Sequence, residues 1–144
     1  LLRGRSALPR LLARRPAPSR ERLVFRGVRE RQKSPDIMEA IQFSALLATL
    51  KQRLAACYGS RLRGVYLFGS HARGEAGETS DVDVLIVLDE ITRYGEEIER
   101  TGELFSELSL KYDTVVSRVF VSESTWKQSD QPFLKHIRAE AISL

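Results

Sequence analysis

The chain has 144 residues, a formal net charge of +4 at pH 7 and 42% hydrophobic residues. This length predicts one folded domain. No apolar run is long enough to cross a membrane and no secretory signal with an apolar centre is visible, so we expect no membrane association. The single cysteine, Cys57, leaves no basis for a disulfide framework, which is typical of a reducing, cytoplasmic location and predicts a small buried side chain at that position.

The charge is unevenly distributed along the chain. Residues 1–36 hold eleven Lys and Arg against three Asp and Glu, a balance of +8, so residues 37–144 have a balance of −4. The basic character therefore belongs to the first segment alone. A mildly acidic domain is not expected to present a broad surface for nucleic acid.

The first segment, residues 1–36, is rich in arginine and carries four of the five prolines. It has no helical or strand periodicity, which predicts a disordered basic tail before a folded domain over residues 38–144. Three interpretations of the tail stay open: an organelle transit peptide, a basic arm for nucleic acid, or a segment that is not translated naturally. The only methionine, Met38, stands just before the first amphipathic helix and favours the third.

The remaining residues alternate between helical and strand patterns. We expect an α/β (α+β) fold in which helices pack on a small mixed sheet, with a central strand that is apolar on both faces. The clustered glutamates of the second helix, including Glu97, predict a solvated face. In chain order the predicted elements are a helix from residue 37 to Gly59, strands over 62–68 and 81–88, a helix over 91–110, a strand over 114–121, a helix start at 122–125, and a short helix from Pro132 that carries Ile142.

Two acidic residues stand at the head of the apolar strand. Asp81 and Asp83 are two residues apart, so a strand would turn both carboxylates to the same face. Such a pair is a suitable binding site for Mg²⁺, because this ion takes hard oxygen ligands from one or two carboxylates and from substrate phosphates.

A glycine corner precedes this pair. Gly69 and Ser70 follow the end of the first strand, where backbone N–H groups and a hydroxyl can approach an anion, and Arg73 lies three residues further on. Phosphate donors beside metal-binding carboxylates predict phosphoryl or nucleotidyl transfer.

These residues form a recognisable signature. Gly-Ser-His-Ala-Arg-Gly over residues 69–74, followed by Ser80, Asp81, Val82 and Asp83, resembles the G-S-x-A-R-G … S-D-x-D motif of minimal nucleotidyltransferases of the DNA polymerase beta superfamily. The resemblance covers residues 38–144. It implies a polymerase-beta-like fold, Mg²⁺ held by Asp81 and Asp83, and ATP or another nucleoside triphosphate held by Gly69, Ser70, Arg73 and Ser80.

One part of the family pattern is absent. The resemblance implies a third carboxylate on the next strand, and the aligned position is Ser117. Asp113 is the nearest acidic residue on that segment, but four extended residues place it roughly 13 Å away, too far for a shared metal site. Catalysis by Asp81 and Asp83 alone would therefore be slow, or completed by a partner.

Two functions follow from the resemblance. The first is a nucleotidyltransferase acting on a hydroxyl of a partner protein, as in toxin–antitoxin systems in which the partner is a HEPN-like toxin. The second is a nucleotide-binding module that transfers nothing and acts by masking that partner, which Ser117 favours. Modification of a small antibiotic is a weaker third option, because the chain is short after its last strand.

Overall fold

The computed structural model describes residues 37–144, so the predictions for the basic tail lie outside the described residues. The chain divides into two units, Leu1–Glu39 and Ala40–Leu144. The second unit contains every strand of the described chain and all of the residues predicted for the site.

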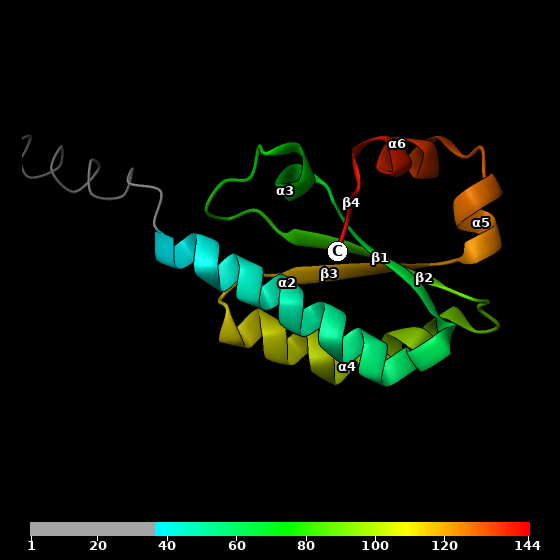
Figure 1. The fold of residues 1–144 in the computed structure, drawn as a ribbon, viewed down its shortest axis with the longest axis horizontal. Coiled ribbons are helices and arrows are strands. Elements are labelled where there is room, and N and C mark those ends of the chain that lie inside the picture. The colour runs from blue at the N-terminus through cyan, green and yellow to red at the C-terminus, as the bar shows by residue number, and fades with distance from the viewer. Residues whose placement is uncertain (1–36) are drawn as a thin grey trace, which may run out of the picture. The chain divides into compact units, whose positions relative to one another are not determined.

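Four strands form one mixed sheet in the order β3-β2-β1-β4 (Figure 1). Strand β1 pairs antiparallel with β2 on one side and with β4 on the other, whereas β2 and β3 are parallel. The bounds are β1 Leu62–Phe68, β2 Val82–Leu88, β3 Val116–Ser122 and β4 Ile142–Ser143. The predicted mixed sheet is therefore confirmed.

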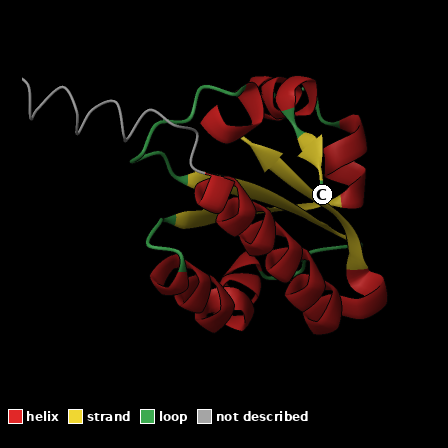
Figure 2. Cartoon of the chain, turned by 60° about the vertical axis from the view of Figure 1, so that its left-hand side comes forward, coloured by secondary structure: helices red, strands yellow, loops and turns green. Residues whose placement is uncertain are grey.

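Helices cover both faces of this sheet (Figure 2). Helices α2 and α4 lie on one face, and α5 and α6 lie on the other (Figure 1). The bounds are α2 Ile37–Tyr58, a 3-10 turn Gly59–Arg61, α3 Ser70–Arg73, α4 Tyr94–Lys111, α5 Glu123–Gln128 and α6 Pro132–Glu140. None of the helices in residues 37–144 combines the length and apolar character that crossing a membrane requires.

Strand β2 is the centre of the core, as its two-faced apolar run predicted. Val84 and Ile86 are fully buried in a cluster with side chains of α2 and α4. Leu85 and Val87 point to the opposite face, where they pack with Ile137 of α6. The alternation that buries these side chains also sets the direction in which Asp83 points.

Two predictions about single side chains were wrong. Cys57 is exposed, because it lies on the outer side of α2 rather than on the face that contacts the sheet. Glu97 is buried, with only 4% of its surface exposed, and accepts a hydrogen bond from Arg61. A charge at this position is tolerated because the 3-10 turn after α2 supplies a guanidinium.

The last segment also differs from the expectation. Helix α6 ends at Glu140, and Ile142 belongs to β4 rather than to that helix. Strand β4 is held by its pairing with β1, and the N–H of Leu144 donates to the carbonyl of Val65 at 2.9 Å. The single-turn helix α3 was not predicted either.

Candidate functional site

The end of β1 makes a sharp corner that only glycine can occupy. Gly69 has φ +76° and ψ −156°, a combination closed to side-chain-bearing residues. A Cβ atom added there would lie 2.3 Å from Oδ2 of Asp83. The chain then enters α3, which is closed by a hydrogen bond from the N–H of Arg73 to the carbonyl of Gly69. The absence of a side chain at Gly69 therefore lets the corner lie directly against a carboxylate.

Asp83 lies between the corner and the neighbouring strand. It pairs with Phe68 of β1 and with Ser117 of β3, and its side chain is half-buried. The hydroxyl of Ser117 donates to Oδ1 of Asp83 at 2.6 Å. The predicted alignment of Ser117 beside the Asp pair is thus confirmed, and no carboxylate stands at that position of β3.

Asp81 lies just before β2 and is exposed at the same opening. Asp113, the other acidic residue considered from the sequence, is in the turn before β3 with φ +49° and does not line this opening. It therefore does not replace the missing carboxylate.

The corner, the head of β2 and helix α6 together line an open cavity of about 540 Å³, which is within the size range of small-ligand sites. All six residues predicted for the site line it. The lining residues are Phe68, Gly69, Ser70 and Arg73 from β1 and α3, Thr79, Ser80, Asp81 and Asp83 from the following loop and β2, and Phe133, His136, Ile137 and Glu140 from α6. Their functional roles stay a prediction, but their proximity is a feature of the fold.

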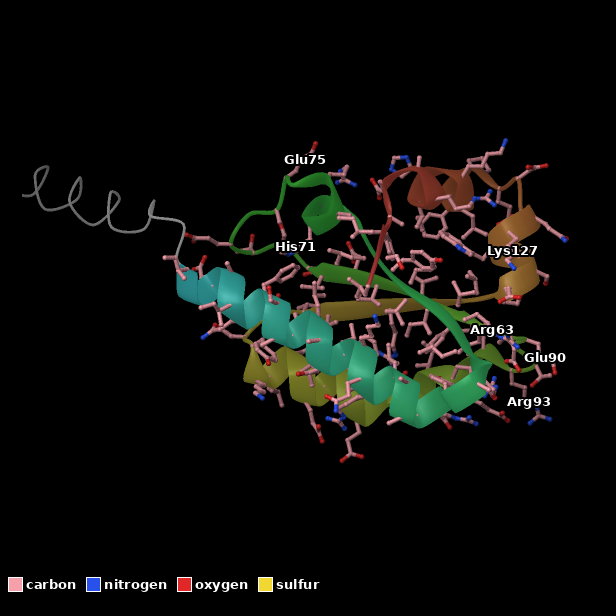
Figure 3. All side chains as sticks on the ribbon, in the orientation of Figure 1. Arg63, His71, Glu75, Glu90, Arg93 and Lys127 are labelled. Atoms are coloured by element: carbon pink, nitrogen blue, oxygen red, sulfur yellow. The ribbon has the colours of Figure 1, made fainter. Side chains whose placement is uncertain are left out.

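Ser80 forms a hydrogen bond within the loop beside this cavity. Its hydroxyl accepts a hydrogen bond from the N–H of Gly77 at 2.9 Å, which ties the polar loop to the head of β2. His71 does not line the cavity: its half-buried ring stacks on Phe43 of α2, with the ring centroids 4.8 Å apart. Figure 3 shows His71 and Glu75 at the α3 end of the molecule, opposite Arg63, Glu90, Arg93 and Lys127.

Glu140 is one of the lining residues that the sequence did not assign to the site, and it bonds directly to the glycine corner. It is the last residue of α6, and Oε1 accepts a hydrogen bond from the N–H of Gly69 at 3.1 Å. Oε2 accepts from Nη1 of Arg73 at 3.0 Å and lies 3.5 Å from Nε2 of His136, an acidic partner that the sequence did not reveal for this histidine. The hydrogen bonds from Arg73 and from Gly69 lower the pKa of Glu140. A sequence signal existed only in the spacing: Glu140 follows the buried Ile137 by three residues and so shares its face of the helix.

The donor set suits a divalent cation that is held jointly with a substrate. Among residues 37–144 no group of three or more His, Cys, Asp or Glu side chains is arranged to hold a metal alone. Both oxygens of Glu140 already accept hydrogen bonds, as does Oδ1 of Asp83, which leaves Asp81 and Oδ2 of Asp83. Two carboxylate groups are the usual protein share of a Mg²⁺ site that is completed by phosphate oxygens and water.

Known proteins resemble this chain in sequence. A family model described as "Nucleotidyltransferase domain" matches residues 44–141. A Methanocaldococcus jannaschii protein, named as a candidate protein adenylyltransferase, is 34% identical over 87 residues that make up 60% of this chain and 84% of that protein. Protein adenylyltransferase MntA of Thermococcus cleftensis is 39% identical over 75 residues, 52% of this chain and 74% of that protein.

A solved structure of a candidate minimal nucleotidyltransferase is 27% identical, with a TM-score of 0.50 over 74% of this chain and 95% of that one. The family model extends from α2 to the end of α6 and so includes the glycine corner, the Asp pair and the helix that closes the cavity. The resemblance that the motif suggested is confirmed, and the chain belongs to the nucleotidyltransferase domain family.

Proposed function

We propose that this chain transfers a nucleoside monophosphate, AMP from ATP in the first instance, to a hydroxyl group of a partner protein. The observation that carries the proposal is the convergence of the Gly-Ser corner, Arg73 and the Asp pair on one cavity. Relatives that are named protein adenylyltransferases support a protein acceptor. The family resemblance stated from the sequence motif suggests a HEPN-like toxin as that acceptor.

The reaction forms one bond and breaks one. The acceptor oxygen bonds to the α-phosphorus, the bond from that phosphorus to the bridging oxygen breaks, and pyrophosphate leaves. The corner formed by Gly69 and Ser70 holds the triphosphate, with the Ser70 hydroxyl as a donor, and Arg73 offsets its charge. Mg²⁺ held by Asp81 and Asp83 would supply neutralisation of the phosphate charge. The acceptor proton leaves to water or to a group of the acceptor, because Ser117 offers no base.

The direct test is calorimetric titration of the chain with ATP, with Mg²⁺ present and with Mg²⁺ chelated. Asp83→Asn and Asp113→Asn form a matched pair, since both remove one carboxylate and only Asp83 lines the cavity. We expect Mg²⁺-dependent binding that is lost in the first variant and retained in the second. Equal loss in both variants, or no binding by the unaltered chain, would contradict the proposal.

Transfer is tested separately with ATP labelled at the α-phosphate and a HEPN-like protein as acceptor. We expect the label to appear on that protein and to disappear with Asp83→Asn.

A second function, a nucleotide-binding module that masks its partner without transfer, is favoured by one observation: the hydroxyl of Ser117 donates to Asp83 where a carboxylate would be needed. ATP binding and complex formation without labelling would support that second function.

A further inference from the structure

Glu140 joins the end of α6 to the glycine corner. Its carboxylate accepts from the N–H of Gly69, at the corner where the proposed function places the triphosphate, and from the guanidinium of Arg73, which the proposed function assigns to the triphosphate charge. The two bonds span 71 and 67 residues of sequence, so only the fold brings these groups together. The side chain of Glu140 is 11% exposed, whereas that of Arg73 is 39% exposed.

Arg73 is held on two of its edges. Nη1 donates to Glu140, and Nε donates to Glu75 at 3.0 Å. No partner of Nη2 is found within residues 37–144, and Arg73 lines the cavity. Because a guanidinium has five N–H donors in a rigid plane, fixing one edge also sets the direction of the others.

We propose that Glu140 is a positioning residue for the triphosphate: it holds the N–H of Gly69 and the guanidinium plane of Arg73 so that the remaining donors of Arg73 face the cavity. This inference rests on the proposed function. It assigns a role in nucleotide binding to a residue of the last helix, which lies outside the Gly-Ser … Asp-x-Asp motif.

The opposite role would be competition, in which Glu140 occupies the place of a phosphate and must leave before the nucleotide binds. The hydrogen bonds and partial burial of Glu140 argue against it. Both carboxylate oxygens are hydrogen-bonded, and removal of the donors from a carboxylate that is only 11% exposed costs more than the loss of a fully exposed ion pair. Glu140 also lies just before β4, whose pairing with β1 anchors this end of α6. The carboxylate therefore stays in place and Arg73 binds phosphate beside it.

The test compares Glu140→Gln with Glu75→Gln. Both variants remove one negative charge beside Arg73, but the side chain of Glu75 is 67% exposed and bonds to Arg73 at the outer edge of the α3 corner (Figure 3). The probe is inorganic tripolyphosphate with Mg²⁺, which carries the phosphates without the base. We expect Glu140→Gln to weaken its binding about tenfold, by analogy with the effect of losing groups that orient ligating side chains. Glu75→Gln should change it by less than about twofold, as for other exposed ion pairs.

Two further readouts separate positioning from general stability. Hydrogen exchange of the Gly69 amide should accelerate in Glu140→Gln while exchange of the β2 amides stays slow. In an Arg73→Ala background, Glu140→Gln should cause little additional loss of tripolyphosphate binding, because its effect passes through Arg73.

Each contrary outcome has a definite meaning. Tighter binding in Glu140→Gln would establish competition and overturn the proposal. Unchanged exchange at Gly69, or additive losses in the double variant, would overturn it as well. A further contrary result is faster exchange of the Gly69 amide in Glu140→Gln while the unaltered chain binds no tripolyphosphate. That result would overturn the positioning role and make Glu140 a purely structural contact. If the unaltered chain bound ATP and Glu140→Gln bound tripolyphosphate as tightly as the unaltered chain does, the inference would be overturned and the proposed function would stay intact.

Discussion

Ser117 and Asp83 are paired residues of neighbouring parallel strands, and their side chains are hydrogen-bonded at 2.6 Å. Replacement of Ser117 by Asp would put a carboxylate where the resemblance implies one. We expect Ser117→Asp to raise the rate of AMP transfer about 100-fold, since a positioned base contributes roughly 10²–10⁴-fold. Single-turnover transfer of labelled AMP measures this, with Ser117→Asn as the control. A rate equal in the two variants would mean that no base is missing at this position.

Gly69 is a second residue whose identity the local geometry demands. Gly69→Ala combines a left-handed φ with a Cβ 2.3 Å from Asp83, so the carboxylate or the corner must move. We expect the free energy of unfolding in urea to fall by about 2 kcal/mol or more. Gly77→Ala is the control, because its Cβ would meet only Ser80 at 3.9 Å. Equal stability of the two variants would show that the corner adapts readily.

At the scale of elements, Glu97 links α4 to the end of α2. Burial opposes its ionisation, but the Tyr58 hydroxyl and the Arg61 guanidinium beside it outweigh burial and lower its pKa below 4.5. Because the folded pKa is lower than the unfolded one, Glu97 stabilises the fold above pH 4.5, and this contribution is lost as the pH falls through the folded pKa.

Glu97→Gln should therefore lower stability near neutral pH, by about 2 kcal/mol for the loss of a charged hydrogen bond. It should also reduce the decline in stability below pH 4.5. Urea unfolding at a series of pH values measures both effects. Glu99→Gln, an exposed change on the same helix, is the control. A decline of unchanged steepness in Glu97→Gln would mean that other carboxylates account for the acid sensitivity.

At the scale of the whole molecule, nucleotide binding should raise the free energy of unfolding. The cavity is lined by three carboxylates against one guanidinium, so a triphosphate without a cation meets repulsion there. We expect Mg²⁺ with ATP at about 100 times its Kd to stabilise the fold by about 2.7 kcal/mol, and ATP with a chelator to have little effect. Thermal unfolding measures this, and a shift that persists in Asp83→Asn would place the nucleotide elsewhere.

Much of the fold could be predicted because its signals are local. The bounds of β1, the central place of β2 and the start of α6 at Pro132 agree with the sequence patterns. Period-two alternation and helix-start residues act over a few neighbours and need no knowledge of the rest of the chain. Strand alternation placed Asp81 and Asp83 on one face, and the family resemblance aligned Ser117 beside them.

The environment of the charged side chains was decided by tertiary structure. Glu97 stands in a polar stretch that is typical of solvated helix surface, yet it is buried, and Glu140 is partly buried; each contacts a guanidinium from a distant segment. Strand β4 forms only because the edge of β1 is open to it. A local pattern records how apolar a residue is, but burial of a charge depends on a partner that folding alone brings near. The sequence by itself thus determined the motif and every strand and α-helix except α3 and β4, and tertiary contacts determined how the corner that carries the motif is held.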